Sequence, residues 1–478
     1  IELIGRAQEP DGYFNTYFIL KEPGQRFRNL REGHELYTLG HMIEAAVAYK
    51  RATGEKRFLE IVQKMADLVA NTFGVEEGKR MGMPGHQEIE LALMKLYEET
   101  GKESYKELAK YFIDVRGCGN RNYFLEEMKQ KDVKRIFPEL NDYRPEYSQS
   151  HLPVRKQRTA EGHAVRAVYM YAAMADIAAE YDDEELLGAC ETLWNNMVHR
   201  RMYVTGGIGS SGILERFTAD YDLPNDYNYC ESCASIGLAF FARRMMQITK
   251  KAKYVEVMER ALYNTVLAGI AMDGKSFFYV NPLEVWPPSC MERTSKEHVK
   301  SVRQKWFGVA CCPANISRTL ASLGEYIYAC EKDTIYVNLF IGNETQITVG
   351  EQKVHLSLET DFPWKNQFKI NVSGVKESVQ LAVRIPEYAQ DYKIFCEGRE
   401  QFYKEKDGYA YITCEKNGRY EVQFVSEPRF VRANPKVRAD EGKVCVMWGP
   451  LVYTVEETDN GENLQALYID TAKPVKKS

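Results

Sequence analysis

Two adjacent cysteines, Cys311 and Cys312, stand directly before a proline. Proline is favoured in the first turn of a helix, so the pattern predicts a helix from about Ala314 to Tyr328 with both thiols at its N-terminus. The helix dipole and unpaired N–H groups stabilise a thiolate there, and a thiolate is both a zinc ligand and a nucleophile. The alternative is that both cysteines are small, inert core residues.

A second cysteine-containing motif, Glu231-x-Cys233, could complete a metal site with this pair. One carboxylate and three sulfurs form a donor set that suits tetrahedral zinc. The predicted ligands are therefore Glu231, Cys233, Cys311 and Cys312. Because Cys230-x-x-Cys233 also has zinc or redox spacing, a purely structural four-cysteine zinc site that uses Cys230 is the alternative.

Three histidines occupy equivalent places in a repeated pattern. Each follows a glycine and opens a helical run with apolar residues at i, i+3 and i+4, and a second helix follows each run. The first helices run to about Tyr49, Tyr97 and Glu180, and the expected openings are His34, His86 and His163. A lone histidine is more often structural than functional, but three in register favour a shared site.

Two further units continue the pattern, one from Tyr229 to about Ile270 and one starting at Cys311. Repeated helix pairs predict a solenoid or a closed ring. In a ring of six pairs, the first helices form the inner wall and their starts converge on one rim. Three further helices are then expected before Ile1, and residues 1–330 form a helical catalytic domain.

The pattern changes at about Asp333, where alternating and β-branched segments are separated by Asn and Gly turns. These segments predict an antiparallel β-sandwich over 331–435. A strand pair near Val444–Tyr453 predicts either a further β domain or the end of the sandwich over 436–478. The expected strands are 334–340, 347–358, 368–372, 379–385 and 409–413.

Two further residues are candidates for chemistry. Glu215 lies in a glycine-rich loop, where it is either a solvated surface acid or the general acid that glycoside cleavage requires. Tyr279, in the segment FFYVNPLE, is either a packed aromatic or part of the cavity lining.

Composition limits the classes of function. The 478 residues carry a net charge of −5, without a Lys/Arg run or an apolar run of membrane-spanning length, so neither a nucleic-acid nor a membrane partner is expected. The 11 scattered cysteines indicate reduced thiols. No signal peptide is seen, which favours a cytoplasmic location although the chain does not begin with Met.

Seven motifs follow one another along the chain: GHELYTLGH, PGHQEIELAL, EGHAVRAVY, TGGIGS, DYDLPNDYNYCESCASIG, FFYVNPLE and GVACCPANISR. Together they resemble family 127 of the glycoside hydrolases, whose best-known activity is bacterial β-L-arabinofuranosidase. The resemblance covers about Gln8 to Tyr328 and implies an (α/α)6 barrel followed by β-sandwich domains, with a catalytic zinc.

The resemblance also implies roles. Cys311 matches the nucleophile, Glu215 the general acid/base, and Glu231, Cys233, Cys311 and Cys312 the zinc ligands. His34, His86, His163 and Tyr279 match sugar-contacting positions. The implied reaction is a retaining double displacement on a small oligosaccharide or glycoconjugate, releasing a terminal β-L-arabinofuranosyl or related furanosyl residue. The expected assembly is a homodimer.

Two alternatives belong to other classes. A carbohydrate lyase or epimerase built on a helical toroid would use His and Tyr as acid and base and would need no thiolate. A non-catalytic sugar-binding protein would hold a structural four-cysteine zinc. Alkylation with and without sugar, and assays of turnover, separate these alternatives from the hydrolase.

Overall fold

The computed structural model describes residues 1–476 and divides the chain into two compact units. The first unit comprises Ile1–Arg201 and Ile208–Asp220, and the second comprises Met202–Gly207 and Tyr221–Ser478. Within the described residues, no helix has the length and apolar character needed to span a bilayer.

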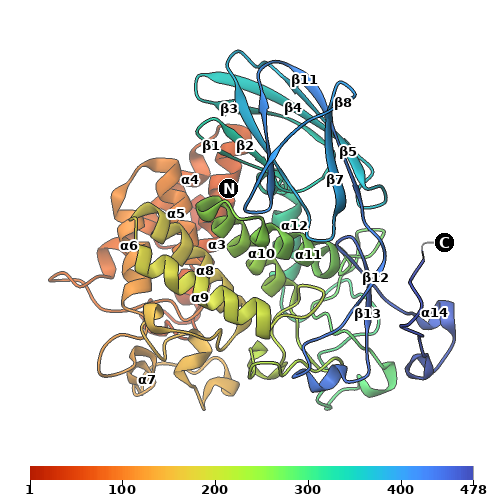
Figure 1. Cartoon of the computed structure of the whole chain (residues 1–478). Coiled ribbons are helices and arrows are strands. Elements are labelled where there is room, and N and C mark those ends of the chain that lie inside the picture. The colour runs from red at the N-terminus through yellow and green to blue at the C-terminus, as the bar shows by residue number, and fades with distance from the viewer. Residues whose placement is uncertain (477–478) are drawn as a thin grey trace. The chain divides into compact units, whose positions relative to one another are not determined.

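The first unit is built from three helical hairpins (Figure 1). All three hairpins were predicted, with ends that differ by a few residues. Their helices are α3 (Glu35–Thr53) with α4 (Arg57–Thr72), α5 (Ile89–Thr100) with α6 (Glu103–Asp114), and α8 (Ala164–Glu180) with α9 (Glu184–Arg200). The short helices α1 (Glu2–Ala7), α2 (Thr16–Leu20) and α7 (Tyr123–Glu127) lie outside the hairpins.

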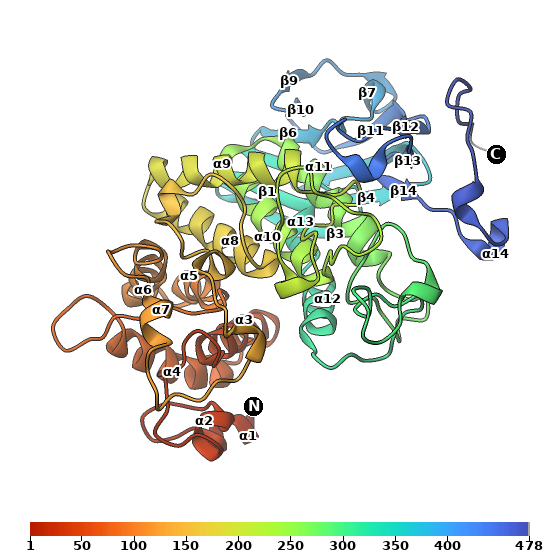
Figure 2. The ribbon, with the colours of Figure 1, turned by 90° about the horizontal axis from the view of Figure 1, so that it is seen from below.

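The first helices of the hairpins form the inner row of this unit. Helix α3 packs on α5 and α5 on α8, while α4, α6 and α9 each pack on their own partner (Figure 2). Helix α8 is buried on every side except at Asp176 and its last two residues. A helix that is apolar on all sides belongs in the interior of a domain. The packing of α3 on α5 and of α5 on α8 brings the starts of these three helices next to one another.

The second unit begins with helices that carry the cysteines. They are α10 (Ser232–Thr249), α11 (Ala252–Ala261), α12 (Cys311–Ala321) and α13 (Gly324–Ile327), and α11 continues into a π-helical turn over Leu262–Leu267. The predicted helix Ala314–Tyr328 was wrong at both ends. It starts at Cys311, because Pro313 is tolerated within the first turn. It ends at Ala321, a separate short helix follows over Gly324–Ile327, and Tyr328 instead pairs with Val337 in a sheet.

Two sheets follow, one of five strands in the order β1-β2-β6-β10-β9 and one of six in the order β3-β4-β5-β11-β7-β8. The strands are β1 (Tyr328–Glu331), β2 (Thr334–Val337), β3 (Asn343–Val349), β4 (Gln352–Thr360), β5 (Gln367–Ser373), β6 (Val379–Arg384), β7 (Gln390–Cys396), β8 (Arg399–Glu400), β9 (Lys404–Lys406), β10 (Tyr409–Cys414) and β11 (Gly418–Val425). Both sheets contribute to one apolar core that includes Ile335, Val354, Ile370, Leu381 and Val422.

One strand pair contradicts the prediction of a wholly antiparallel sandwich. Strands β2 and β6 run parallel, with Ile335 opposite Leu381. Between them the chain passes through β3, β4 and β5 of the other sheet and so re-enters the first sheet in its original direction. Parallel neighbours require such a long crossover connection, and here three strands supply it instead of a helix.

A third sheet contains β12 (Arg429–Val431), β13 (Cys445–Trp448) and β14 (Leu451–Tyr453). The pair β13–β14 confirms the strands expected near 444–453, and β12 was not expected. The remaining helix, α14 (Glu457–Asn460), is short and exposed.

A buried ionic cluster joins α11 to the five-stranded sheet of the same unit. The Arg384 side chain in β6 is fully buried, lies 2.7 Å from Glu256 and also pairs with Glu259. Its Nε donates to the carbonyl of Asn338 at 2.7 Å, and the Tyr388 hydroxyl donates to Glu259 at 3.0 Å. Burying a charge is costly unless it is paired or hydrogen-bonded, and this cluster supplies both for Arg384.

Candidate active site

Four side chains of the second unit converge in the arrangement expected of a metal centre. One ligand atom from each of Glu231, Cys233, Cys311 and Cys312 lies within 4.8 Å of all the others. Glu231 is the N-cap of α10 and Cys233 lies in its first turn, while the cysteine pair opens α12, which packs on α10. The N-termini of two helices therefore meet at this cluster, where their dipoles favour negative charge.

Individual contacts within this cluster are short. The Sγ atoms of Cys233 and Cys312 are 3.3 Å apart, and Glu231 Oε1 lies 3.3 Å from Cys311 Sγ and 3.6 Å from Cys312 Sγ. Tetrahedral zinc with Zn–S bonds of about 2.3 Å separates its sulfur ligands by about 3.8 Å. The donor set therefore suits a metal ion, and the 3.3 Å between Cys233 and Cys312 is about 0.5 Å shorter than the separation in a zinc site.

The three thiols differ in acidity. Hydrogen bonding with Cys233 and Cys312, and with Tyr279, lowers the pKa of Cys311 to about 2 despite burial. Burial raises the pKa values of Cys233 and Cys312. The Tyr279 hydroxyl lies 2.7 Å from Cys311 Sγ. A Cys311 thiolate beside the Glu231 carboxylate places two anions in contact, which a bound cation would neutralise.

Cys230 is not a member of this four-residue group. Its backbone has a positive φ of 40°, and its sulfur lies against Gly207, where an added Cβ would be 2.9 Å away. The thiol is buried, and burial raises its pKa. The alternative of a four-cysteine site that includes Cys230 therefore gains no support from this geometry.

The three predicted histidines gather in the first unit. The ring centroids of His34 and His86 are 5.7 Å apart, and those of His86 and His163 are 5.4 Å apart. His34 is the N-cap of α3 and His163 the N-cap of α8, whereas His86 lies three residues before α5. We call these three side chains the histidine row.

Crowded backbone explains why a glycine precedes each histidine. A Cβ atom on Gly33, Gly85 or Gly162 would lie 2.5, 2.4 or 1.9 Å from a carbonyl oxygen of Asn29, Arg31 or Glu146, respectively. No side chain fits at these distances, so only glycine allows the chain to turn inward and place the next residue in the row.

Backbone contacts define the hydrogen-bonding character of each ring. Nδ1 of His34 lies 2.6 Å from the Glu32 carbonyl and Nδ1 of His86 lies 2.8 Å from the Gln87 carbonyl, so both carry hydrogen on Nδ1 and present Nε2 as an acceptor. His163 differs, because its Nδ1 accepts from the Arg166 backbone N–H at 3.5 Å. Its Nε2 is therefore the donor.

Glu215 is the partner of His163. The distance from Glu215 Oε2 to His163 Nε2 is 2.7 Å, and the Glu215 side chain is 34% exposed. Leu214 and Glu215 both have positive φ angles, near 58° and 53°, a conformation that ordinary residues rarely adopt. Strained backbone of this kind clusters at functional sites, and here it turns the carboxylate towards the row.

The predicted site residues thus come from both units. Glu215 and the histidine row belong to the first unit, and Tyr279 and the four ligand candidates belong to the second. Sequence reasoning missed Tyr37, whose ring lies 4.3 Å from that of His86, and Arg166. Arg166 follows His163 by three residues in EGHAVRAVY, so it lies one helical turn away, and this spacing could have identified it.

Comparisons with known proteins agree over nearly the whole chain. Residues 1–325 match the family model of the β-L-arabinofuranosidase GH127 catalytic domain, 334–426 the GH127 middle domain, and 428–477 the family 127 C-terminal domain. A non-reducing end β-L-arabinofuranosidase of Bifidobacterium longum subsp. longum is 41% identical over 97% of this chain and 72% of its own length. The chain belongs to glycoside hydrolase family 127.

Solved structures of family 127 enzymes have the same fold. Ara127N, a GH127 β-L-arabinofuranosidase from Geobacillus stearothermophilus T6, superposes with a TM-score of 0.92 at 49% identity, covering 97% of this chain and 73% of that one. The GH127 β-arabinofuranosidase BT3674 gives a TM-score of 0.83 at 38% identity, covering 94% and 70%. This family 127 chain is therefore a glycoside hydrolase with helical and sheet-containing parts.

Proposed function

We propose that this glycoside hydrolase releases a terminal β-L-arabinofuranosyl residue with retention of configuration, with Cys311 as nucleophile and Glu215 as general acid/base. The surroundings of Cys311 are the main support for the proposal. The Tyr279 hydroxyl lies 2.7 Å from Cys311 Sγ, and Glu231 Oε1 lies 3.3 Å from it. Hydrogen bonding lowers the pKa of Cys311. The names of the family 127 relatives support the choice of sugar.

The proposed reaction has two steps. Glu215 protonates the departing glycosidic oxygen while the Cys311 thiolate attacks the anomeric carbon, which breaks the C–O bond and forms a thioglycosyl bond. Glu215 then removes a proton from water, which displaces the thiolate and releases the sugar. Zinc, when bound by Glu231, Cys233, Cys311 and Cys312, would hold the sulfur as an oriented, less basic thiolate.

The histidine row and Tyr279 are proposed to contact the sugar. Nε2 of His34 and of His86 can each accept from a sugar hydroxyl, and Nε2–H of His163 keeps Glu215 in place. The repeated helical hairpins support the predicted (α/α)6 barrel. The following stay predictions: the barrel itself, the domain limits at 330 and 435, the homodimer and the cytoplasmic location.

A panel of nitrophenyl glycosides tests the choice of substrate. We expect the β-L-arabinofuranoside to be cleaved fastest, and NMR of the first product should show retained configuration. Cleavage of only pyranosides, or inversion, would contradict the proposal. Turnover without added water in the product would indicate the lyase alternative, and sugar binding without turnover the non-catalytic one.

Metal analysis of two matched cysteine variants tests the zinc site. Cys233→Ser should lose most of its zinc, because serine is a far poorer zinc ligand than a thiolate. Cys230→Ser should keep about one zinc per chain, since its thiol points to Gly207. Full zinc occupancy in Cys233→Ser, or loss of zinc in Cys230→Ser with retention in Glu231→Gln, would overturn the assignment.

A further inference from the structure

A buried arginine of the first unit lies behind the histidine row. Arg166 lies in the first turn of α8 and is only 3% exposed. Its guanidinium donates to the Gly85 carbonyl at 2.6 Å. Its Cζ lies 4.4 Å from the ring centroid of Tyr147, and that ring lies 5.7 Å from the His163 ring. Arg166 therefore connects the segments that carry His86 and His163.

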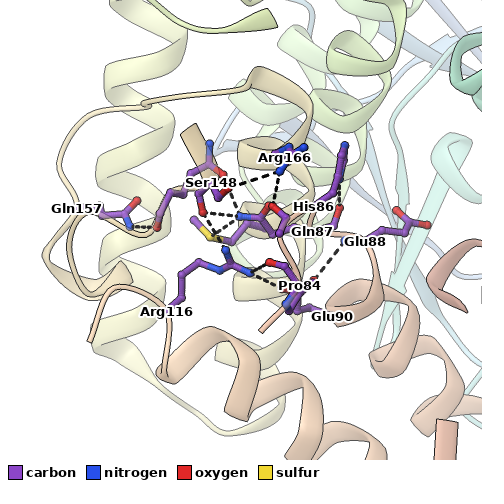
Figure 3. A network of polar contacts seen from close by, with 12 residues as sticks. Pro84, His86, Gln87, Glu88, Glu90, Arg116, Ser148, Gln157 and Arg166 are labelled. Atoms are coloured by element: carbon purple, nitrogen blue, oxygen red, sulfur yellow. Dashed lines mark hydrogen bonds and ion pairs between the residues drawn. The ribbon is translucent and has the colours of Figure 1, made fainter. Parts of the chain in front are cut away.

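A second buried arginine holds the same turn from another side. Arg116 donates to the Pro84 carbonyl at 2.8 Å and to the Ser148 carbonyl at 2.8 Å (Figure 3). Arg166 reaches the hydroxyl of the same serine at 3.5 Å. The two guanidinium groups thus bind adjacent carbonyls, those of Pro84 and Gly85, just before His86.

The two arginines differ in charge compensation. Arg116 pairs with the buried Glu90 at 3.3 Å, whereas no ion pair within 4.0 Å involves Arg166 among residues 1–476. Arginine stays protonated in proteins, so Arg166 places a positive charge beside the row that no directly paired carboxylate balances. In a low-dielectric interior that charge acts over several ångströms.

We propose that Arg166 is a positioning residue of the sugar site, which fixes the Gly85–His86 turn against the start of α8 and disfavours positive charge on the neighbouring imidazoles. This inference rests on the proposed sugar-contacting role of the row. Neutral imidazoles can accept from sugar hydroxyls, whereas imidazolium groups only donate.

The groups around His34 and His86 support this charge effect. Burial is the largest cause that lowers the pKa of His34, to about 4, and the Arg166 charge is the next. The pKa of His86 is lowered well below its usual value by the same two causes in the same order. The charged and titratable neighbours are Arg166, His163 and Tyr169 of α8, Glu215 of the acidic loop, Tyr37 of α3, and the His41–Glu88 pair beside Tyr37.

The test compares Arg166→Met with Arg116→Met in the full chain. NMR of ¹³C-labelled histidine follows each imidazole against pH, with His34→Gln and His86→Gln to assign the signals. In Arg166→Met, we expect His34 and His86 to titrate about one unit or more closer to 6.5 than in the wild type. Arg116→Met loses a comparable buried guanidinium, but its partner Glu90, whose pKa burial raises, should then take up a proton, so the net charge stays the same and both titrations should stay in place.

Kinetics supply the second readout. The acidic limb of kcat/KM should move to higher pH in Arg166→Met. For a shift of about one unit at His34, the loss in kcat/KM relative to the wild type should grow by about threefold between pH 7.5 and pH 4.5, mainly through KM. Arg166→Lys keeps the charge but not the planar fork. In this variant the pKa values of His34 and His86 should stay near those of the wild type, and KM should rise. Arg166→Lys also replaces Arg166→Met as the test if the methionine variant does not fold.

Three outcomes would overturn the proposal. They are unchanged histidine titrations in a folded Arg166→Met, equal shifts in Arg116→Met, and a wild-type KM in Arg166→Lys. The titrations need neither substrate nor turnover. If the wild type cleaved no arabinofuranoside but the titrations behaved as expected, the proposed function would fail while the effect of Arg166 on the row would stand.

Discussion

Cys311→Ser should show no measurable turnover of an arabinofuranoside. A serine hydroxyl stays protonated at neutral pH and is a much weaker nucleophile than a thiolate. The environment of position 311 is arranged for an anion, because it opens α12 and receives the Tyr279 hydroxyl at 2.7 Å. Steady-state assays with substrate in excess measure the loss, and Cys330→Ser, which removes an exposed thiol of the same unit, should retain wild-type rates.

Loss of zinc could also inactivate Cys311→Ser, so alkylation of the wild type provides an independent measurement. Because the pKa of Cys311 is lowered, its reaction with iodoacetamide should stay nearly constant from pH 8 to pH 5. An ordinary thiol with a pKa of about 8.5 slows about tenfold per unit over that range. Bound sugar should protect Cys311. Retained activity in Cys311→Ser, or labelling that follows an ordinary thiol, contradicts the nucleophile assignment.

Glu215→Gln should lower kcat/KM on an unactivated glycoside by about 10²–10⁴-fold, the usual contribution of a general acid or base. It should keep its zinc, because Glu215 is not one of the four ligand candidates. The amide preserves the size of the side chain and its approach to His163, so the fold should not change. Activity assays with parallel elemental analysis separate this effect from metal loss.

The leaving group provides an internal control for Glu215. A nitrophenolate needs little protonation, so the loss should shrink on nitrophenyl substrates, and a sugar adduct should then accumulate on Cys311 and be visible by intact mass. Glu161→Gln alters a carboxylate of the same unit with similar exposure, 29% against 34%, and should behave as the wild type. Wild-type turnover in Glu215→Gln, or an adduct mapped to a carboxylate, would refute the mechanism.

Local patterns carried much of the prediction. The three hairpins of the first unit follow from apolar periodicity and from Gly54 and Gly101, which end α3 and α5 in the left-handed conformation that glycine favours. The places of His34, His86 and His163 follow from register alone. Strand β11 was missed although Tyr420, Val422 and Phe424 alternate in the way that predicts a strand.

Other features depend on contacts distant in sequence, and no local pattern encodes them. The parallel pairing of β2 with β6 depends on the path of the chain through the other sheet. The end of α13 depends on the pairing of Tyr328 with Val337. Arg166 lies in an apolar helix and gives no sign of its contact with Gly85, 81 residues earlier. The structure, in contrast, shows these contacts directly.

The Arg384 cluster bears on how this protein can be cut into parts. The family boundary between catalytic and middle domains falls near residue 330, yet Arg384 lies beyond it and neutralises Glu256 and Glu259 before it. Cutting the chain there would leave the Glu256 and Glu259 carboxylates without the Arg384 cation. Removing one partner of a buried ion pair lowers the free energy of unfolding by about 3–5 kcal/mol. Helices α10 and α11 should therefore unfold together with the sandwich in a single calorimetric transition. The unit that unfolds cooperatively then extends across the boundary between the catalytic and middle domains of the family.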